Sequence, residues 1–359
     1  MDRLRPIGSN RNLSTPFFMR SGLAMFLVFL LAAGCRGLTV RTQSKVFLHS
    51  SPVEDRGPLA EMPVQLARSE SPQKIALIDV DGLLLNSPIT GLGNVSENPV
   101  AVFREKLDRV EADPCFRAVV LRINSPGGGV TATDIMWRDL RMMKARRGIP
   151  VVACLMDLAT GGAYYLATAA DQIIAHPTTI TGGMGVILNL YNLRDAMMQF
   201  NILGVPIKAG PYTDLGSPIR ELDDQGRALL QHLADQYHAR FQEVVRMCRP
   251  QHDPARQEDF DGRVFLAQEA MDRGLIDGIG YLDDAIALAR RLAHASQAKV
   301  VVLHRSYDAA RSVYATTPIQ PIQTNLFPLS VPGFDRSQLP TFLYIWQPEP
   351  TLERRATGR

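Results

Sequence analysis

The chain has 359 residues, of which 46% are apolar and 21% are charged, which is the balance of a globular protein able to bury a full core and not of a disordered chain. The net charge is only +3, and several arginines lie at the two ends, so no continuous basic face indicates nucleic acid as a partner. The four cysteines form no CxxC pair and lack a histidine spacing suited to zinc, so neither a disulfide framework nor a metal site is indicated.

The N-terminus has the features of an export signal. Arginines precede the apolar run from Leu23 to Gly34, which is short for a membrane span but has the length of a signal-peptide core. The run ends in Leu-Ala-Ala-Gly-Cys35, which resembles a bacterial lipobox, where the cysteine becomes lipidated after cleavage. We predict that residues 1–35 are a signal peptide or lipoprotein signal with Cys35 as the lipidation site, and that the chain is exported and tethered to the outer (periplasmic or extracytoplasmic) face of a bacterial membrane. An uncleaved anchor, or an ordinary signal with a chance cysteine, is the alternative.

Composition divides the rest of the chain into three parts. Residues 36–73 are polar, contain proline and show no clear period, which predicts a flexible linker. The folded domain is expected to span residues 74–303. Residues 304–359 form a proline-containing C-terminal tail, in which the segment from Phe342 to Trp346 is apolar enough to dock on the domain.

Within the domain, apolar strands alternate with amphipathic helices, which predicts a mostly parallel sheet covered by helices, an α/β fold. Asn98-Pro99 is a good start for the first helix, and a long amphipathic helix is expected after residue 221. We expect another strand and helix after Val186. The predicted strands are 75–80, 118–123, 150–155 and 172–175.

Two glycine-rich turns each follow a predicted strand and open a helix. They are Asn-Ser-Pro-Gly-Gly-Gly at 124–129 and Ala-Thr-Gly-Gly at 159–162. Glycine lets the backbone approach a substrate closely, and the N–H groups of such a turn can stabilise a developing oxyanion. Other α/β proteins use similar turns for phosphate, although neither turn is a Walker sequence because no Lys-Ser or Lys-Thr follows.

The order of these motifs resembles one family. The run 122–130 is similar to the oxyanion turn of signal peptide peptidase A-like serine peptidases, 159–167 to their nucleophile turn, and 262–278 to their closing motif. The resemblance covers about residues 74–290. It implies a single-domain spiral of repeated ββα units, as in the crotonase and Clp-protease superfamily, with oxyanion donors at Gly128 and Gly161. It also implies peptide or protein substrates, no cofactor, and assembly into homo- or hetero-oligomeric rings.

Both halves of the catalytic pair differ from this family's pattern. Thr160 stands where the family has its nucleophilic serine, and Thr213 stands where it has the lysine that acts as general base. A lysine of lowered pKa can take the hydroxyl proton, whereas a threonine hydroxyl cannot accept it near neutral pH. The substitutions therefore predict weak or absent peptidase activity.

Two other residues are candidates for a substitute base. Lys208 lies five positions before Thr213, but the family commonly has a lysine there beside the catalytic one. His176 stands where the family usually has asparagine, and histidine titrates in the useful range. We expect His176 to be a hydrogen-bonded turn residue before Pro177.

Three functions remain to be weighed. The first is a membrane-tethered peptidase that uses Thr160. The second is a non-catalytic peptide-binding or assembly subunit in a mixed ring with an active paralogue. The third is an acyl-CoA enzyme of the wider superfamily, which the export signal disfavours because coenzyme A chemistry is cytosolic.

Overall fold

The structure, a computed structural model, describes residues 58–65, 71–87, 90–91, 94–95, 97–305 and 342–346. All of them belong to the unit formed by residues 52–359. The predicted signal segment and Cys35 lie outside the described residues. Within the described part, no helix is both long and apolar enough to cross a membrane.

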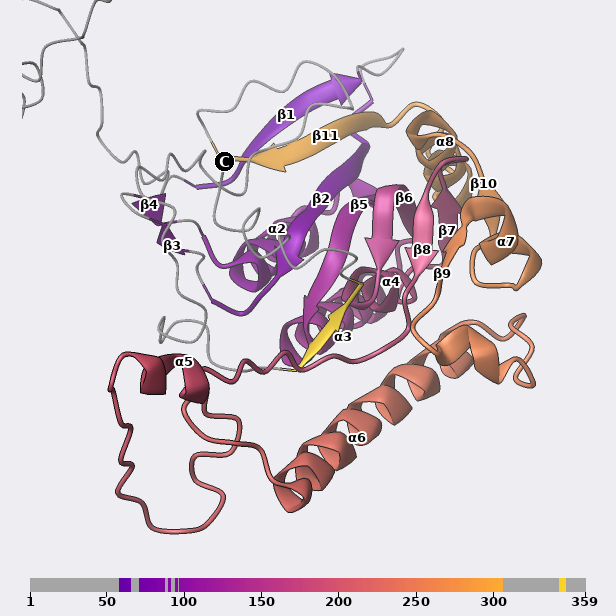
Figure 1. The fold of residues 1–359 in the computed structure, drawn as a ribbon. Helices are drawn as coiled ribbons and strands as arrows, with labels where there is room; N and C mark the ends of the chain where they lie inside the picture. Colours follow the sequence, from indigo (N-terminus) through magenta and orange to yellow (C-terminus); the bar gives the residue numbers. More distant parts are fainter. Residues whose placement is uncertain are drawn as a thin grey trace, which may run out of the picture. The chain divides into compact units, whose positions relative to one another are not determined.

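A ten-stranded sheet is the centre of the fold (Figure 1). Its main path from β11 to β10 is parallel, and β1 pairs antiparallel with β11 at one edge. Along this path the order is β1 (Ala60–Gln65), β11 (Lys299–His304), β2 (Lys74–Leu84), β5 (Phe116–Gly129), β6 (Val151–Thr160), β7 (Gln172–Ala175) and β10 (Gly278–Ile279).

Three short strands join the sheet beside this path. The strand β8 (Ile180–Gly182) pairs parallel with the end of β6, and β9 (Val264–Leu266) pairs antiparallel with β8. The strand β12 (Leu343–Ile345) pairs antiparallel with the end of β5. A separate two-stranded hairpin is formed by β3 (Thr90–Gly91) and β4 (Asn94–Val95).

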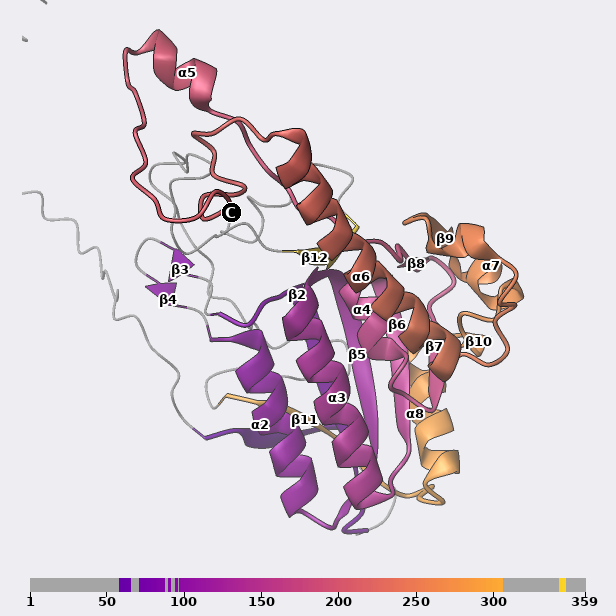
Figure 2. The ribbon, with the colours of Figure 1, turned by 90° about the horizontal axis from the view of Figure 1, so that it is seen from below.

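Helices cover both faces of the sheet, because successive side chains of the buried strands point to opposite sides. From β2, Ile75 and Leu77 pack in one apolar cluster with α8 (Leu282–Leu292). Ala76 and Ile78 pack in the other cluster with α2 (Pro99–Ala112) and α3 (Val130–Arg147), which lie side by side in Figure 2. The predicted α/β fold with a mostly parallel sheet is confirmed.

The predicted helix starts and strands agree in several places. Asn98 caps α2 by accepting a hydrogen bond from the Val100 N–H at 2.9 Å, with Pro99 in the first turn. The strand predicted at 172–175 is β7. The segment predicted to dock, Phe342–Trp346, contains β12.

Other expectations are wrong in detail. Residues 60–65, expected in a flexible linker, form β1, because the β11 edge offers them backbone partners. The strand expected to end at residue 123 continues as β5 to Gly129, because β2 and β12 both pair with its glycines. After Val186 the described chain forms an isolated bridge at Ile187 and the short helix α5 (Arg194–Gln199), with no strand.

The remaining helices come after β6 in the chain. The helix α4 (Gly162–Ala167) leaves the end of β6, and α7 (Ala267–Asp272) follows β9 after the 3-10 turn η1 (Gln257–Phe260). The long helix α6 (Asp224–Cys248) buries Phe241 and Val244 near its C-terminal end. Near its N-terminal end, Leu229 and Leu233 are exposed, so only one half of α6 docks on this chain's core.

A cluster of charged side chains is buried between β2, β5 and α2. The Arg122 guanidinium contacts the Asp79 carboxylate at 2.6 Å, and both residues are at most 3% exposed. Burial lowers the pKa of the Lys106 ammonium in the same cluster. Burial and the neighbouring Asp79 charge raise the pKa of Asp81 to about 7, and the Asp81 Oδ2 has no hydrogen-bond partner among the described residues.

Replacing Asp81 by asparagine should therefore stabilise the chain in a pH-dependent way. The folded-state pKa of Asp81 lies above its unfolded value of 3.8, so ionisation costs folding free energy increasingly between about pH 4 and pH 7. We expect the stabilisation by Asp81→Asn to be larger at pH 8 than at pH 5 by about 2 kcal/mol, measured by urea unfolding. The exposed Asp108→Asn is the control, and an equal effect of Asp81→Asn at both pH values would contradict this assignment.

Candidate active site

Thr160 lies at a sharp turn from strand to helix. It is the last residue of β6, its side chain is fully buried, and its Oγ1 donates a hydrogen bond to the Pro126 carbonyl at 3.2 Å. Gly161 follows with φ +53° and ψ −121°, a conformation that L side chains rarely adopt. A Cβ on Gly161 would lie 2.4 Å from the Tyr344 carbonyl oxygen, so the turn needs glycine for close backbone approach.

The second glycine-rich segment lies next to this turn. Gly127 has φ +106°, and a Cβ there would lie 2.7 Å from the Gly162 nitrogen and 2.0 Å from the Tyr344 carbonyl oxygen. Gly128 would place a Cβ 2.1 Å from the Leu84 carbonyl oxygen. The structure therefore brings the two predicted turns together, with Tyr344 of β12 against both.

The predicted oxyanion donors differ in their surroundings. The Gly161 N–H donates to the Gly182 carbonyl at 2.9 Å, so it is engaged within the fold. Gly128 lies opposite Tyr344 in the antiparallel ladder of β5 and β12. Before the Gly161 N–H can bind an oxyanion, it must therefore break its hydrogen bond with the Gly182 carbonyl.

Tyr344 anchors β12 through its side chain. The ring stacks on Tyr165 with centroids 5.5 Å apart and lies 4.8 Å from the Phe241 centroid. Its hydroxyl donates to the Tyr237 carbonyl at 2.6 Å, and the residue is fully buried. Burial also raises the pKa of the Tyr344 hydroxyl. Residues 342–346 dock as predicted from their apolar character, but no local signal in the sequence indicated this aromatic pocket.

The structure does not join Thr213 to Thr160. Thr213 is exposed on the excursion from residue 198 to 223, where its Oγ1 donates to the Ala209 carbonyl at 2.7 Å. Figures 1 and 2 both show this excursion extending away from the sheet, whose strand β6 ends at Thr160. Among the residues that the structure describes, no hydrogen bond links the two threonines.

Lys208 lies on the same excursion as Thr213 and is bound there. Its Nζ forms an ion pair with Asp214 and donates to the Pro211 carbonyl at 3.2 Å. Asp214 also pairs with Arg220 at 2.6 Å. The Lys208 ammonium and the Arg220 guanidinium keep the pKa of Asp214 below its usual value. The structure therefore places Lys208 as a partner of Asp214.

His176 lies in the turn after β7. Its Nδ1 is 2.9 Å from the Thr178 hydroxyl, and its ring makes an edge contact with Tyr281 at 4.6 Å between centroids. Its backbone N–H donates to Leu155, which is five residues before Thr160 and thus about 16 Å away along an extended strand. The structure therefore places His176 in a hydrogen-bonded turn, and separates it from Thr160.

Another histidine, which the sequence did not indicate, lies closer to the glycine segment beside Thr160. The His238 Nε2 on α6 is 3.1 Å from the Met184 carbonyl, and Met184 follows Gly183. A Cβ on Gly183 would lie 3.2 Å from the Thr160 Cβ. Because Nε2 contacts a carbonyl oxygen, it is the protonated nitrogen in this arrangement and does not act there as a base.

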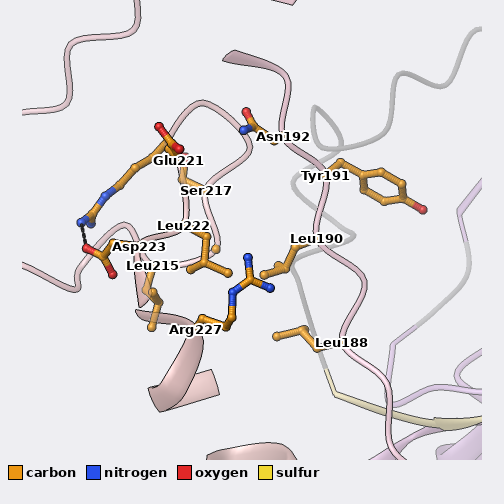
Figure 3. Close-up of a pocket in the computed structure, with 12 residues that line it drawn as sticks. Leu188, Leu190, Tyr191, Asn192, Leu215, Ser217, Glu221, Leu222, Asp223 and Arg227 are labelled. Atoms are coloured by element: carbon orange, nitrogen blue, oxygen red, sulfur yellow. Dashed lines mark hydrogen bonds and ion pairs between the residues drawn. The ribbon is translucent and has the colours of Figure 1, made fainter. Parts of the chain in front are cut away.

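A cavity of about 510 Å³ adjoins the segment that follows Ile187 (Figure 3). Leu188 and Leu190 lie on one side of it, Leu215 and Leu222 on the other, and Arg227 of α6 lies between them. The lining is thus mixed, with four leucines beside polar and charged side chains that include Asn192, Glu221 and Arg227. Within the described residues, no group of three or more His, Cys, Asp and Glu side chains could hold a metal ion.

The amino-acid sequence of the chain is similar to those of known peptidases. Residues 143–296 match the model of peptidase family S49. The chain is 32% identical over 200 residues to the chloroplastic serine protease SPPA of Arabidopsis thaliana, covering 55% of this chain and 29% of that protein. It is 26% identical over 236 residues to a putative signal peptide peptidase SppA of Enterococcus faecium, covering 66% and 68%, respectively.

Two further proteins are similar to the chain. Protease 4 of Salmonella typhi is 29% identical over 223 residues, which cover 62% of this chain and 35% of that protein, so this chain spans about a third or less of two of these relatives. The solved 1510-N membrane-bound stomatin-specific protease, a mutant in complex with a substrate peptide, aligns with a TM-score of 0.44 and 14% identity over 66% of this chain and 94% of that one. Residues 143–296 therefore form a peptidase family S49 domain, and the chain is a relative of the signal peptide peptidase A and Protease 4 proteins.

Proposed function

We propose that this protein is an exported, membrane-tethered family member that binds peptide strands and has weak or no peptidase activity. The observation that supports this most is the environment of Thr160. Its hydroxyl is buried and donates to the Pro126 carbonyl, while Thr213, at the position of the family's lysine, is exposed on a separate excursion. The hydroxyl thus has a hydrogen-bond acceptor but no basic side chain among its contacts within the described part of the chain.

This arrangement lacks one step of nucleophilic catalysis. A hydroxyl attacks a peptide carbonyl only when a base removes its proton, and a carbonyl oxygen such as that of Pro126 is too weak a base for this. The two glycine turns, by contrast, are retained and lie against an extended strand. The glycine turns are thus retained, and no basic side chain contacts the Thr160 hydroxyl within the described residues.

A second candidate function is that of a non-catalytic subunit in a mixed ring with an active paralogue. It is favoured by the apolar side chains exposed on the excursion and on α6, which a neighbouring subunit would cover. Those that are at least half exposed on the excursion are Phe200 at 76%, Ile202 at 52%, Leu203 at 74%, Val205 at 81% and Ile207 at 100%. Isolation of the chain from its own cells as a strict homo-oligomer would count against this role.

The proposed inactivity is tested with the full chain in a mild detergent. Hydrolysis of casein and of a synthetic signal peptide is measured for the native chain and for Thr160→Ala. We expect the two rates to be equal and no greater than the background without protein. Native hydrolysis that Thr160→Ala abolishes would instead establish a threonine peptidase with another base.

A further inference from the structure

The strand β12 makes main-chain hydrogen bonds along both of its edges, as a bound extended peptide does. On the β5 side, the Val130 N–H donates to the Phe342 carbonyl and the Trp346 N–H donates to the Pro126 carbonyl, both at 3.2 Å. On the other side, Leu343 and Ile187 exchange two hydrogen bonds of 2.9 and 3.0 Å. Proteins bind extended peptides in this way, through main-chain hydrogen bonds to an open strand edge.

The same strand covers the nucleophile position. The Pro126 carbonyl that accepts from Thr160 Oγ1 also accepts from the Trp346 N–H. A Cβ on Gly183 would lie 3.1 Å from the Trp346 Cβ and 3.2 Å from the Thr160 Cβ. The backbone from Tyr344 to Trp346 therefore crosses the nucleophile turn, which accounts for the complete burial of Thr160.

One side chain fixes the register of this strand. Tyr344 fills an apolar pocket against Tyr165 and Phe241, and its hydroxyl reaches the Tyr237 carbonyl. In the antiparallel ladder, Phe342 is hydrogen-bonded to Val130, and Trp346 to Pro126. The pair between them, Tyr344 and Gly128, is therefore also at a hydrogen-bonding position. This pair sets the Tyr344 carbonyl opposite Gly128, a predicted oxyanion donor.

We propose that Phe342–Trp346 is an internal pseudosubstrate, which occupies the peptide-binding slot of its own chain and blocks Thr160, and that the Tyr165–Phe241 pocket selects an aromatic side chain in any peptide that replaces it. The inference rests on the proposed peptide-binding function. A replacing peptide is an extended segment with an aromatic residue at the place of Tyr344. Its residues before that place run along the segment after Ile187, toward the cavity lined in part by Leu188 and Leu190.

The test measures binding of a fluorescein-labelled peptide with the sequence of residues 342–346, flanked by lysines for solubility, by fluorescence anisotropy. The protein is the full chain in its native form, as Tyr344→Ala and as the control Tyr344→Phe. We expect Tyr344→Ala to bind the peptide at least about tenfold more tightly than the native chain, because an empty pocket removes the internal competitor. Tyr344→Phe, which keeps the aromatic ring, should stay within about threefold of the native chain.

The choice of an aromatic side chain is tested in the same assay. A peptide with alanine in place of the central tyrosine should bind Tyr344→Ala at least about tenfold more weakly than the original peptide. Equal affinity of the native chain and Tyr344→Ala would overturn the pseudosubstrate, and equal affinity of the two peptides would overturn the aromatic pocket. Native affinity that rises on dilution would show that a second copy supplies the segment, and would overturn its action within one chain.

A second measurement uses only the native chain, so that it does not depend on the folding of a variant. Excess peptide should increase hydrogen exchange at the amides of Leu343 and Trp346, since both leave the slot when the peptide enters. Unchanged protection of these amides while the peptide binds would overturn the proposal. Cleavage of the peptide, read by mass spectrometry, would overturn the proposed inactivity but not the pseudosubstrate.

Discussion

In a chain that carries Tyr344→Ala to open the slot, replacing Thr160 by serine and Thr213 by lysine is expected to raise the rate of casein hydrolysis at least about 10³-fold. The two substitutions restore an unhindered hydroxyl and a side chain that can accept its proton when desolvated. The rate is measured with the full chain in detergent. Each of the two substitutions alone should leave the rate close to that of Tyr344→Ala, because nucleophile and base act as a unit.

The concentration dependence of this gain follows from the position of Thr213. Residue 213 lies on an excursion that extends away from the sheet, so under the proposed ring assembly we expect a lysine there to act on a serine of an adjacent subunit. We expect the activity of the doubly substituted chain to fall on dilution as the assembly dissociates. Thr160→Ala combined with Thr213→Lys, again with Tyr344→Ala, is the matched control, and an assembled doubly substituted chain as silent as this control would contradict the restored pair.

Replacing Arg122 by methionine should lower the free energy of unfolding by about 3 to 5 kcal/mol. The Arg122 guanidinium contacts Asp79 at 2.6 Å in a region that is at most 3% exposed, and Asp81 lies in the same cluster. Loss of the guanidinium leaves two buried carboxyl groups without their principal cation. Urea unfolding of the full chain measures the effect.

The control for this prediction removes both members of the ion pair. Asp79→Asn combined with Arg122→Met should recover most of the loss, because no uncompensated charge then remains at position 79. A cost of less than about 1 kcal/mol for Arg122→Met alone would show that the pair contributes no more than an exposed one.

Local patterns predicted the elements whose determinants lie close together in the sequence. The cap at Asn98 and the strand at 172–175 follow from residues within a few positions of each other. The strand β1 did not follow, because its partner β11 is more than 200 residues away and supplies the hydrogen bonds that a polar segment needs. The extension of β5 to Gly129 has the same cause, since β12 comes from the C-terminal tail.

The residues of the candidate site also differ in whether their positions could be predicted from the sequence. The strand-to-helix turn at Thr160–Gly161 was predictable, because its motif contains the glycines that close backbone approach requires. The positions of Thr213 and Lys208 were not, since an excursion bound by Asp214 and Arg220 has no periodic signal. The pocket for Tyr344 combines residues of α4 and α6, and no spacing within either helix indicates it.

Hydrolysis by the Tyr344→Ala chain, with Thr160 and Thr213 unchanged, tests directly whether the protein has kept a peptide slot and lost its catalytic base. This variant removes the pseudosubstrate anchor, so that a silent site cannot be attributed to a blocked slot. We predict that this variant binds the labelled peptide and leaves casein and the peptide uncleaved. Cleavage by Tyr344→Ala that is abolished when Thr160→Ala is added would contradict the account, because it would show that the native chain is an inhibited threonine peptidase.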